Sequence, residues 1–159
     1  MEDIKRIVTP IDFSDNTEEI VSTAACIAGK FSADLDLIYV AESFEDYTTF
    51  RTPPANLHAL REELLNSAKE QMNAFIEKHK EKFSALGASS IKGEVLSGDV
   101  AEQIIKYAGD ANEQVIVMGT HGYKGFNRLV FGSVADKVVK AACCAVMTIK
   151  PCSKECKTK

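Results

Sequence analysis

Gln114-Val-Ile-Val-Met-Gly119 is apolar over four consecutive positions and rich in β-branched residues, which predicts a strand. Successive side chains of a strand point to opposite faces, so a strand with no polar alternation has no solvent-facing side. Such runs are typical of parallel sheets that helices cover on both faces. This short stretch therefore predicts a covered, parallel sheet.

The segments on either side of this strand alternate between strand and helix patterns. Apolar or alternating runs predict strands over Ile4–Ile11, Asp34–Ala41, Ser89–Leu96, Gln114–Gly119 and Ala145–Lys150. Apolar residues recur at helical spacing in the segments between them, which predicts helices over 17–31, 57–86, 100–108 and 133–142. Asp12-Phe-Ser-Asp15 is expected to supply the turn and the N-cap of the first helix, and Asp99 the cap of the third.

Strands that alternate with helices predict an α/β fold wound by right-handed crossovers. We expect a single domain with an open five-stranded parallel sheet sandwiched by helices, of Rossmann-like type. Ligands of such sheets bind beyond the carboxyl ends of the strands, where the strand order reverses. The segments that follow the strands at 4–11 and 114–119 are therefore the candidate site.

A long loop with several glycines follows the strand at 114–119: Gly119-Thr-His-Gly122-Tyr-Lys-Gly-Phe-Asn-Arg-Leu-Val-Phe-Gly132-Ser133-Val134. Glycine lets the backbone approach an anion closely, and we expect free amides of Gly132, Ser133 and Val134 to point outward at the helix N-terminus. The loop therefore predicts a phosphate site. It is neither a Walker A loop nor a dinucleotide fingerprint, because it lacks Gly-Lys-Ser/Thr and G-x-G-x-x-G.

Each of these residues also has a purely structural explanation. Gly119 and Gly122 permit a turn, and Ser133 caps its helix, as serine often does. The combination favours phosphate binding, because a loop of this length is more than a connection between a buried strand and a helix requires.

The spacing Gly119-x2-Gly122-x9-Gly132-Ser133 is similar to the ATP-binding signature of universal stress proteins. Ile7-Val-Thr-Pro-Ile-Asp-Phe-Ser14 resembles the first strand of that family, and 132–139 with 142–150 resembles its last unit. The resemblance covers nearly the whole chain. It implies a universal stress protein domain over residues 1–151, of the adenine nucleotide alpha hydrolase-like fold, and a short tail over 152–159.

The resemblance implies a set of nucleotide contacts. Asp12 would contact the ribose or adenine, since a carboxylate accepts hydrogen bonds from ribose hydroxyls; the alternative is that Asp12 only opens the following turn with Ser14. Val40 would form part of the apolar wall of the adenine pocket, the alternative being an ordinary core valine. Gly98 would lie in a loop that borders the nucleotide, the alternative being a plain turn. The implied nucleotide-binding residues are Pro10, Ile11, Asp12, Val40, Gly98, Met118, Gly119, His121, Gly122, Gly132, Ser133 and Val134, with no catalytic and no metal-ligating residue.

Three polar residues of the glycine loop have possible roles at the phosphates, and one residue departs from the family pattern. His121 would donate a hydrogen bond to phosphate or only order the loop, and Lys124 and Arg128 would screen phosphate charge or remain solvated. The family often has proline where Val100 stands, so the turn that borders the site departs here from the family pattern.

The implied function is an ATP-binding regulator or sensor in stress response, with AMP or ADP as alternative nucleotides and Mg or Mn held through the phosphates. The alternative is a slow ATPase or phosphoryl-transfer enzyme at the same site. In-line transfer needs a metal-binding carboxylate, and Gly119–Ser133 contains no Asp or Glu, so we prefer the regulator. A flavin-binding or electron-transfer module would fit the sheet but not the glycine spacing.

The family usually forms homodimers through its last strand. Val146-Met-Thr-Ile149 is apolar, and an apolar edge strand is a liability unless it is paired. We expect a homodimer through this strand, the alternative being a strand buried by its own helices. An unknown regulatory protein is the second expected partner.

The composition limits which other classes of protein this chain can belong to. With 159 residues, 45% of them hydrophobic, the chain is long enough to bury one core. The net charge of −4 gives no reason for broad attraction to nucleic acid or anionic lipid. The apolar runs are too short to cross a bilayer and 1–10 lacks a signal-peptide pattern, so we expect a cytoplasmic protein. Five irregularly spaced cysteines predict reduced thiols, and for Cys152 and Cys156 a frayed tail is expected rather than a metal site.

Overall fold

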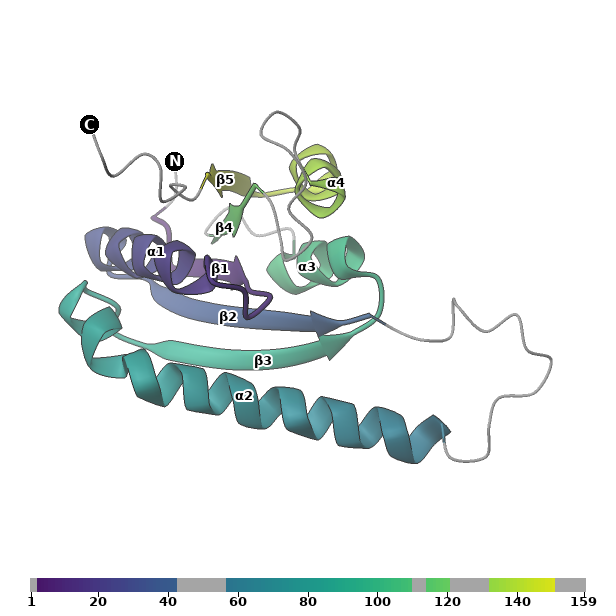
Figure 1. The fold of residues 1–159 in the computed structure, drawn as a ribbon. Helices are drawn as coiled ribbons and strands as arrows, with labels where there is room; N and C mark the ends of the chain where they lie inside the picture. The colour runs from purple at the N-terminus through teal and green to yellow at the C-terminus, as the bar shows by residue number, and fades with distance from the viewer. Residues whose placement is uncertain (1–2, 43–56, 110–113, 121–131, 151–159) are drawn as a thin grey trace, which may run out of the picture.

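The computed structural model describes residues 3–42, 57–109, 114–120 and 132–150, with the side chain of Leu57 left out (Figure 1). Within these ranges the chain forms five strands and four helices. The strands are β1 (Arg6–Pro10), β2 (Asp34–Ala41), β3 (Ile91–Ser97), β4 (Gln114–Gly119) and β5 (Ala145–Ile149). The helices are α1 (Thr17–Phe31), α2 (Leu57–Ala85), α3 (Val100–Ala108) and α4 (Ser133–Ala141).

All five strands are parallel, and their order in the sheet is β3-β2-β1-β4-β5. From β1 the chain winds first through β2 to β3 and then returns to the other side of β1 for β4 and β5. The strand order therefore reverses between β1 and β4. The predicted fold class is confirmed, and the two segments that the sequence marked as the candidate site follow these two neighbouring strands.

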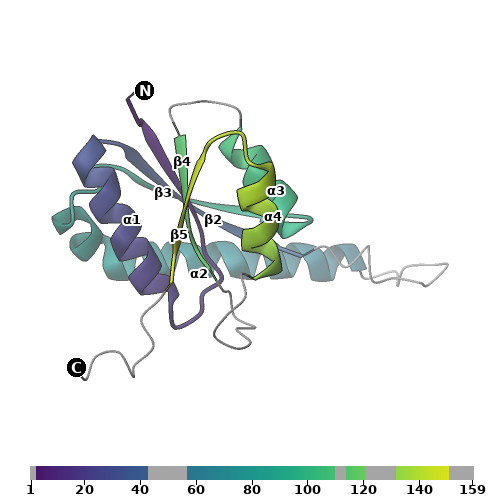
Figure 2. The ribbon, with the colours of Figure 1, turned by 90° about the horizontal axis from the view of Figure 1, so that it is seen from above.

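The core is divided into two layers by the sheet. Leu35 and Leu37 of β2 pack with α1 and α2 on one face, while Ile38 and Val40 pack with α3 and α4 on the other. Figure 2 shows α1 on one side of the sheet and α3 with α4 on the other. Because both faces are covered, successive residues of a strand are buried together, which explains the unbroken apolar runs.

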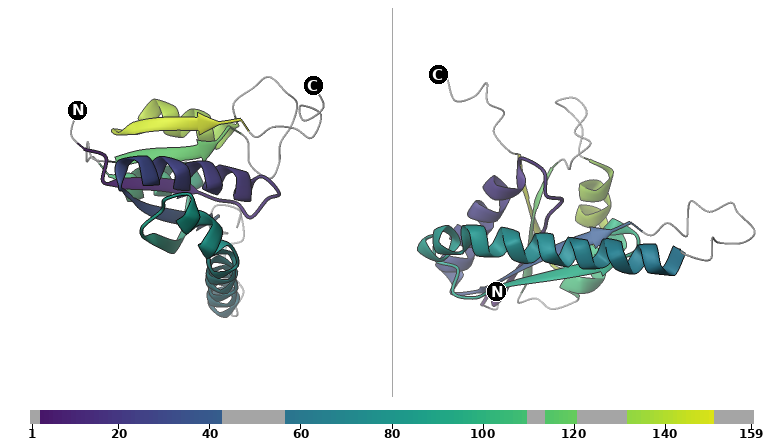
Figure 3. Two further views of the ribbon diagram at one scale, coloured as in Figure 1. Left: turned by 90° about the vertical axis from the view of Figure 1, so that its left-hand side faces the viewer. Right: turned by 60° about the horizontal axis from the view of Figure 1, so that its bottom comes forward.

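The long helix α2 runs along the edge strand β3 at close range (Figure 3). A Cβ atom added to Gly93 of β3 would lie 2.5 Å from Cγ of Met72 and 2.8 Å from Cδ1 of Ile76. The missing side chain of Gly93 is thus what allows α2 to lie against this strand. Gly29 of α1 makes a similar approach to Gly87, where its Cβ would lie 2.7 Å from the Cα.

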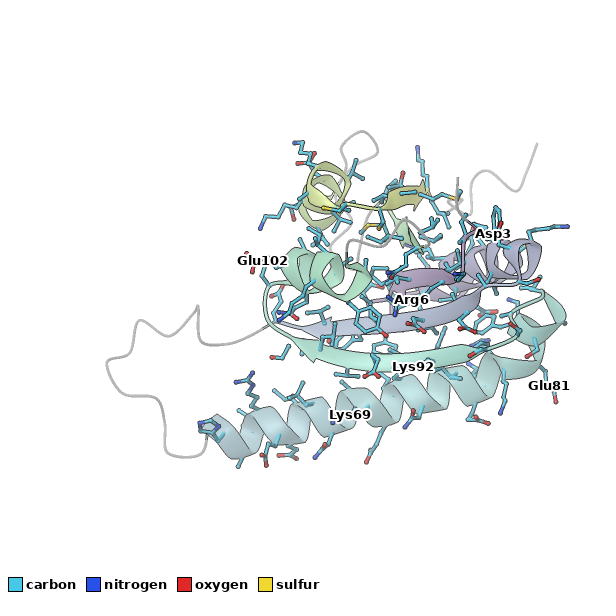
Figure 4. All side chains as sticks on the ribbon, turned by 180° about the vertical axis from the view of Figure 1, so that it is seen from behind. Asp3, Arg6, Lys69, Glu81, Lys92 and Glu102 are labelled. Atoms are coloured by element: carbon cyan, nitrogen blue, oxygen red, sulfur yellow. The ribbon has the colours of Figure 1, made fainter. Side chains whose placement is uncertain are left out.

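A polar network occupies the amino ends of β1, β2 and β4, opposite to the candidate site. Nε of Arg6 donates to Oε1 of Gln114 at 2.9 Å, and the Tyr107 hydroxyl of α3 donates to Oδ2 of the buried Asp36 at 2.9 Å. Arg6, labelled in Figure 4, also lies 3.7 Å from Asp36. Burial and the bond to Asp36 raise the pKa of Tyr107. These polar groups, of which Asp36 and Gln114 are buried, are paired with one another and belong to the scaffold.

Five of the predicted elements have a boundary one or two residues from the observed one, and one predicted cap is wrong. The strands expected at 4–11, 89–96 and 145–150 span 6–10, 91–97 and 145–149. The helices expected to end at 86 and 142 end at 85 and 141. The N-cap of α1 is Asn16, with no side-chain cap bond, and the Asp12 carboxylate accepts from the Ser14 amide within the preceding turn. The predicted cap of α3 is confirmed: Asp99 accepts from the amide of Glu102 at 3.0 Å.

Candidate functional site

All five parallel strands end at one edge of the sheet, and β1 and β4 separate there. The pairing of β1 with β4 ends at Val8 opposite Ile116, although β4 continues to Gly119. On its other side β1 stays paired with β2 through Pro10, and the amide of Ile11 donates to the carbonyl of Ile38 at 2.9 Å. The residues that follow β1 therefore leave the sheet at the point where the strand order reverses, which is where α/β sheets bind ligands.

Asp12 is the second residue after β1, and its two carboxylate oxygens have different surroundings. Oδ1 accepts from the Ser14 amide at 3.0 Å and from the Thr17 hydroxyl at 3.2 Å. Oδ2 is buried and has no hydrogen-bond partner among the described residues. The turn with Ser14 that the alternative expects is present, and it accounts for only one of the two oxygens.

The turn depends on an unusual backbone conformation at Phe13, which has φ of 55°. This left-handed region is unfavourable for a bulky residue. Packing holds it there: the Phe13 ring lies 5.0 Å from that of Tyr39 in β2 and 6.4 Å from that of Phe75 in α2, between centroids. Tertiary contacts to two other elements thus shape the segment that carries Asp12.

The base of the glycine loop is closed by main-chain hydrogen bonds. The Thr120 amide donates to the Ile149 carbonyl at 2.8 Å, and the Gly132 amide donates to the Thr120 carbonyl at 2.9 Å. The prediction that the Gly132 amide is free is therefore wrong, because this bond joins the two ends of the loop. Gly132 is the N-cap of α4, so the alternative role of Ser133 as the cap is wrong as well.

Ser133 and Val134 are the first two residues of α4, whose opening amides have no acceptor within the helix. Ser133 is exposed, while the Val134 side chain packs against the core below α4. The predicted contacts His121 and Gly122, and the loop cations Lys124 and Arg128, lie outside the described residues.

The predicted apolar contacts are divided between the two faces of the sheet. Val40 and Met118 are buried on the side of α3 and α4, and Ile11 is buried on the side of α1 and α2. Pro10 and Gly119 are half-buried at the same edge. The side chains of Val40 and Met118 are core residues, as the structural alternative for Val40 expects.

Gly98 lies on the far side of β2 from β1, where its amide donates to the Ala41 carbonyl at 3.0 Å. Its φ is 139°, and a Cβ there would lie 2.9 Å from Nε2 of Gln103. The turn expected at Gly98 is thus present, and its backbone conformation needs a glycine.

Sequence reasoning missed one residue of this site. Thr17, at the start of α1, is buried, and its hydroxyl contacts the Asp12 carboxylate. The signal that would have found it is a threonine five residues after the aspartate, in the first turn of a helix that begins beside the site.

Within the described ranges, no group of three or more His, Cys, Asp or Glu side chains is arranged to hold a metal ion. The three cysteines described, Cys26, Cys143 and Cys144, are free, and burial raises the pKa of the Cys144 thiol. No helix of the described part of the chain has the length and apolar character needed to cross a membrane.

Comparison with known proteins identifies the family. The model of the universal stress protein family matches residues 3–150. The chain belongs to the universal stress protein family. A universal stress protein of Methanocaldococcus jannaschii is 37% identical over 152 residues, which cover 95% of this chain and 85% of the relative. The structure of the universal stress protein UspA from Lactobacillus plantarum matches with a TM-score of 0.77 and 26% identity, over 94% of this chain and all of that one.

Two further universal stress protein structures share the fold and contain a nucleotide. One, from Archaeoglobus fulgidus, is a complex with dAMP, with a TM-score of 0.60 and 22% identity over 94% of this chain and all of that one. The other is a complex with cAMP, with a TM-score of 0.62 and 18% identity over 95% of this chain and all of that one. At these identities the likeness establishes the shared fold.

Proposed function

We propose that this universal stress protein binds an adenine nucleotide, preferably ATP, where β1 and β4 separate, and acts as a nucleotide-dependent regulator or sensor in the cytoplasm during stress. The observation that carries the proposal is the second carboxylate oxygen of Asp12. Oδ2 is buried without a hydrogen-bond partner among the described residues, and leaving a buried carboxylate oxygen unpaired costs free energy. A ribose hydroxyl or an adenine amino group would supply the donor.

The phosphates of the nucleotide would lie toward α4. The amides of Ser133 and Val134 open this helix, and the N-terminus of a helix attracts anions through its unpaired N–H groups and its dipole. Gly119 and Gly132 would let the backbone approach the phosphates, with His121 and Gly122 between them in the sequence. Mg or Mn would be held through the phosphates.

The base would lie along the ends of β1, β2 and β4. Since the side chains of Val40, Met118 and Ile11 are buried in the core, their contribution would come from the backbone at the strand ends. Pro10 would border the base on β1, and Gly98 would border the site beyond β2. The dAMP and cAMP complexes of two structural neighbours support an adenine nucleotide as the ligand class.

A regulator fits this site better than an enzyme, because Gly119–Ser133 has no carboxylate to hold a metal for phosphoryl transfer. Binding of the nucleotide would alter a surface that a partner protein recognises.

The proposed homodimer would use β5, which is an edge strand with Met147 45% exposed. Pairing with a second copy would cover this edge.

Thermal unfolding with and without ATP and magnesium tests the proposal, since a ligand that binds only the folded state raises the melting temperature. ATP, ADP, AMP and GTP are compared at equal concentration, and we expect the adenine nucleotides to raise the melting temperature more than GTP. Asp12→Ala should abolish most of the shift. Asp15→Ala, an exposed carboxylate three residues away, is the matched control. An unchanged melting temperature of the unaltered protein at millimolar ATP would refute nucleotide binding.

A further inference from the structure

We infer that Thr17 is a positioning residue for nucleotide recognition: its buried hydroxyl orients the Asp12 carboxylate so that Oδ2 is presented to the nucleoside. This inference rests on the proposed function. Thr17 is 2% exposed, and its hydroxyl lies 3.2 Å from Oδ1 of Asp12. Nothing in the sequence pattern of the glycine loop involves this residue.

The two donors to Oδ1 come from both sides of the turn. Ser14 donates its amide from within the turn, and Thr17 donates its hydroxyl from the first residue of α1. The Thr17 amide in addition donates to the Ser14 carbonyl at 3.0 Å. The carboxylate is therefore tied to the start of a helix that packs on the sheet, and not only to its own loop.

This arrangement makes the two oxygens of Asp12 unequal before any ligand binds. A carboxylate rotates freely about its last torsion angle when nothing holds it. Two donors on Oδ1 restrict that rotation and leave Oδ2 as the oxygen without a partner among the described residues. A ligand donor then meets an oriented acceptor, and affinity gains because less ordering is required upon binding.

The turn keeps this geometry although Phe13 stands in a strained left-handed conformation. The Phe13 ring is held by Tyr39 and Phe75, which belong to β2 and α2. Local strain that the surroundings enforce is common where a binding group must be held in place. The strain at the residue next to Asp12 is consistent with a preorganised carboxylate.

The other explanation is that Thr17 only stabilises the turn. A purely structural role would lower the stability of the protein, and any effect on affinity would not depend on the Asp12 side chain. The positioning role predicts that the effect of Thr17 on affinity acts through Asp12 and vanishes without it. A double-mutant cycle separates the two explanations.

The experiment measures ATP affinity at a temperature where all variants are folded, for the unaltered protein, Thr17→Val, Thr17→Ser and Asp12→Ala, and for Asp12→Ala combined with Thr17→Val. We expect Thr17→Val to weaken binding about fivefold, the value typical of one hydrogen bond, and Thr17→Ser to stay within about twofold of the unaltered protein. In the Asp12→Ala background, Thr17→Val should cause no further loss. Thr23→Val, on the same helix with its hydroxyl bonded to the Glu19 carbonyl, is the control and should bind normally.

Unchanged affinity of Thr17→Val, with the unaltered protein binding ATP, would overturn the inference and leave the proposed function intact. An equal loss with and without Asp12 would also overturn it, in favour of the structural role. If the unaltered protein binds no adenine nucleotide, the proposed function fails and the inference fails with it.

Discussion

Two buried threonines provide a sharp test of the structure, because the same substitution should have opposite effects at the two positions. Thr9 of β1 is 0% exposed, and its hydroxyl has no hydrogen-bond partner among the described residues. Thr17 is 2% exposed, and its hydroxyl is bonded to Asp12. Valine has nearly the shape of threonine and replaces the hydroxyl by a methyl group, so each variant isolates one hydroxyl.

The expected change in the free energy of unfolding depends on whether each hydroxyl is hydrogen-bonded. A buried polar group without a partner costs about 1–3 kcal/mol, so Thr9→Val should raise the free energy of unfolding by about 1 kcal/mol or more. Thr17→Val removes a formed hydrogen bond and withdraws a donor from a carboxylate, so it should lower the free energy of unfolding by about 1–2 kcal/mol. For a domain of this length, 1 kcal/mol corresponds to a change in melting temperature of about 2–4 °C.

Urea unfolding followed by circular dichroism measures both variants. The slope of the free energy with urea should be unchanged, so that the midpoint alone reports stability. Thr23→Val, a partly exposed position on α1, should lie within about 0.5 kcal/mol of the unaltered protein. A destabilised Thr9→Val would refute the reasoning, since it would mean that the Thr9 hydroxyl has a partner that offsets its burial.

Two further predictions concern the packing of α2 and the cap of α3. Gly93→Ala should lower the free energy of unfolding by about 1–3 kcal/mol in the same urea assay, because its Cβ would collide with Met72 and Ile76; an effect near zero would contradict the close packing. The amide of Glu102 lowers the pKa of Asp99. Asp99→Ala should cost about 1 kcal/mol at pH 7. In urea unfolding over a pH series the difference should begin to shrink below the ordinary aspartate pKa of about 4 and vanish only once the pH has fallen through the lowered pKa of Asp99 in the folded protein, where the carboxylate is protonated.

Local features of the sequence predicted much of this molecule. The helices at 17–31 and 100–108 and the strands at 34–41 and 114–119 were predicted at their observed bounds, because each has a strong period or an unbroken apolar run. The cap by Asp99 followed from a single residue type at a helix start. The family resemblance, carried by the glycine spacing, was confirmed by the match over residues 3–150.

The candidate site was predicted less completely, since its details depend on contacts between distant segments. The Gly132 amide was expected to be free, but it bonds the Thr120 carbonyl across the loop. Asp12 was found, but the difference between its two oxygens depends on Thr17, which only the folded turn brings within hydrogen-bond distance. The residues at 121–131 that the glycine pattern includes lie outside the described part of the structure.

By itself, the sequence determined the order of strands and helices along the chain and the need for a sheet covered on both faces, because residue periodicity and apolar run length are local properties. The tertiary structure alone decided that β1 and β4 stop pairing at Val8 and Ile116, that Arg6 meets Gln114 across 108 positions of sequence, and that one oxygen of Asp12 is held while the other is left without a described partner. Strand order and hydrogen-bond partners arise from the simultaneous packing of segments far apart in the chain, and no local pattern encodes that packing.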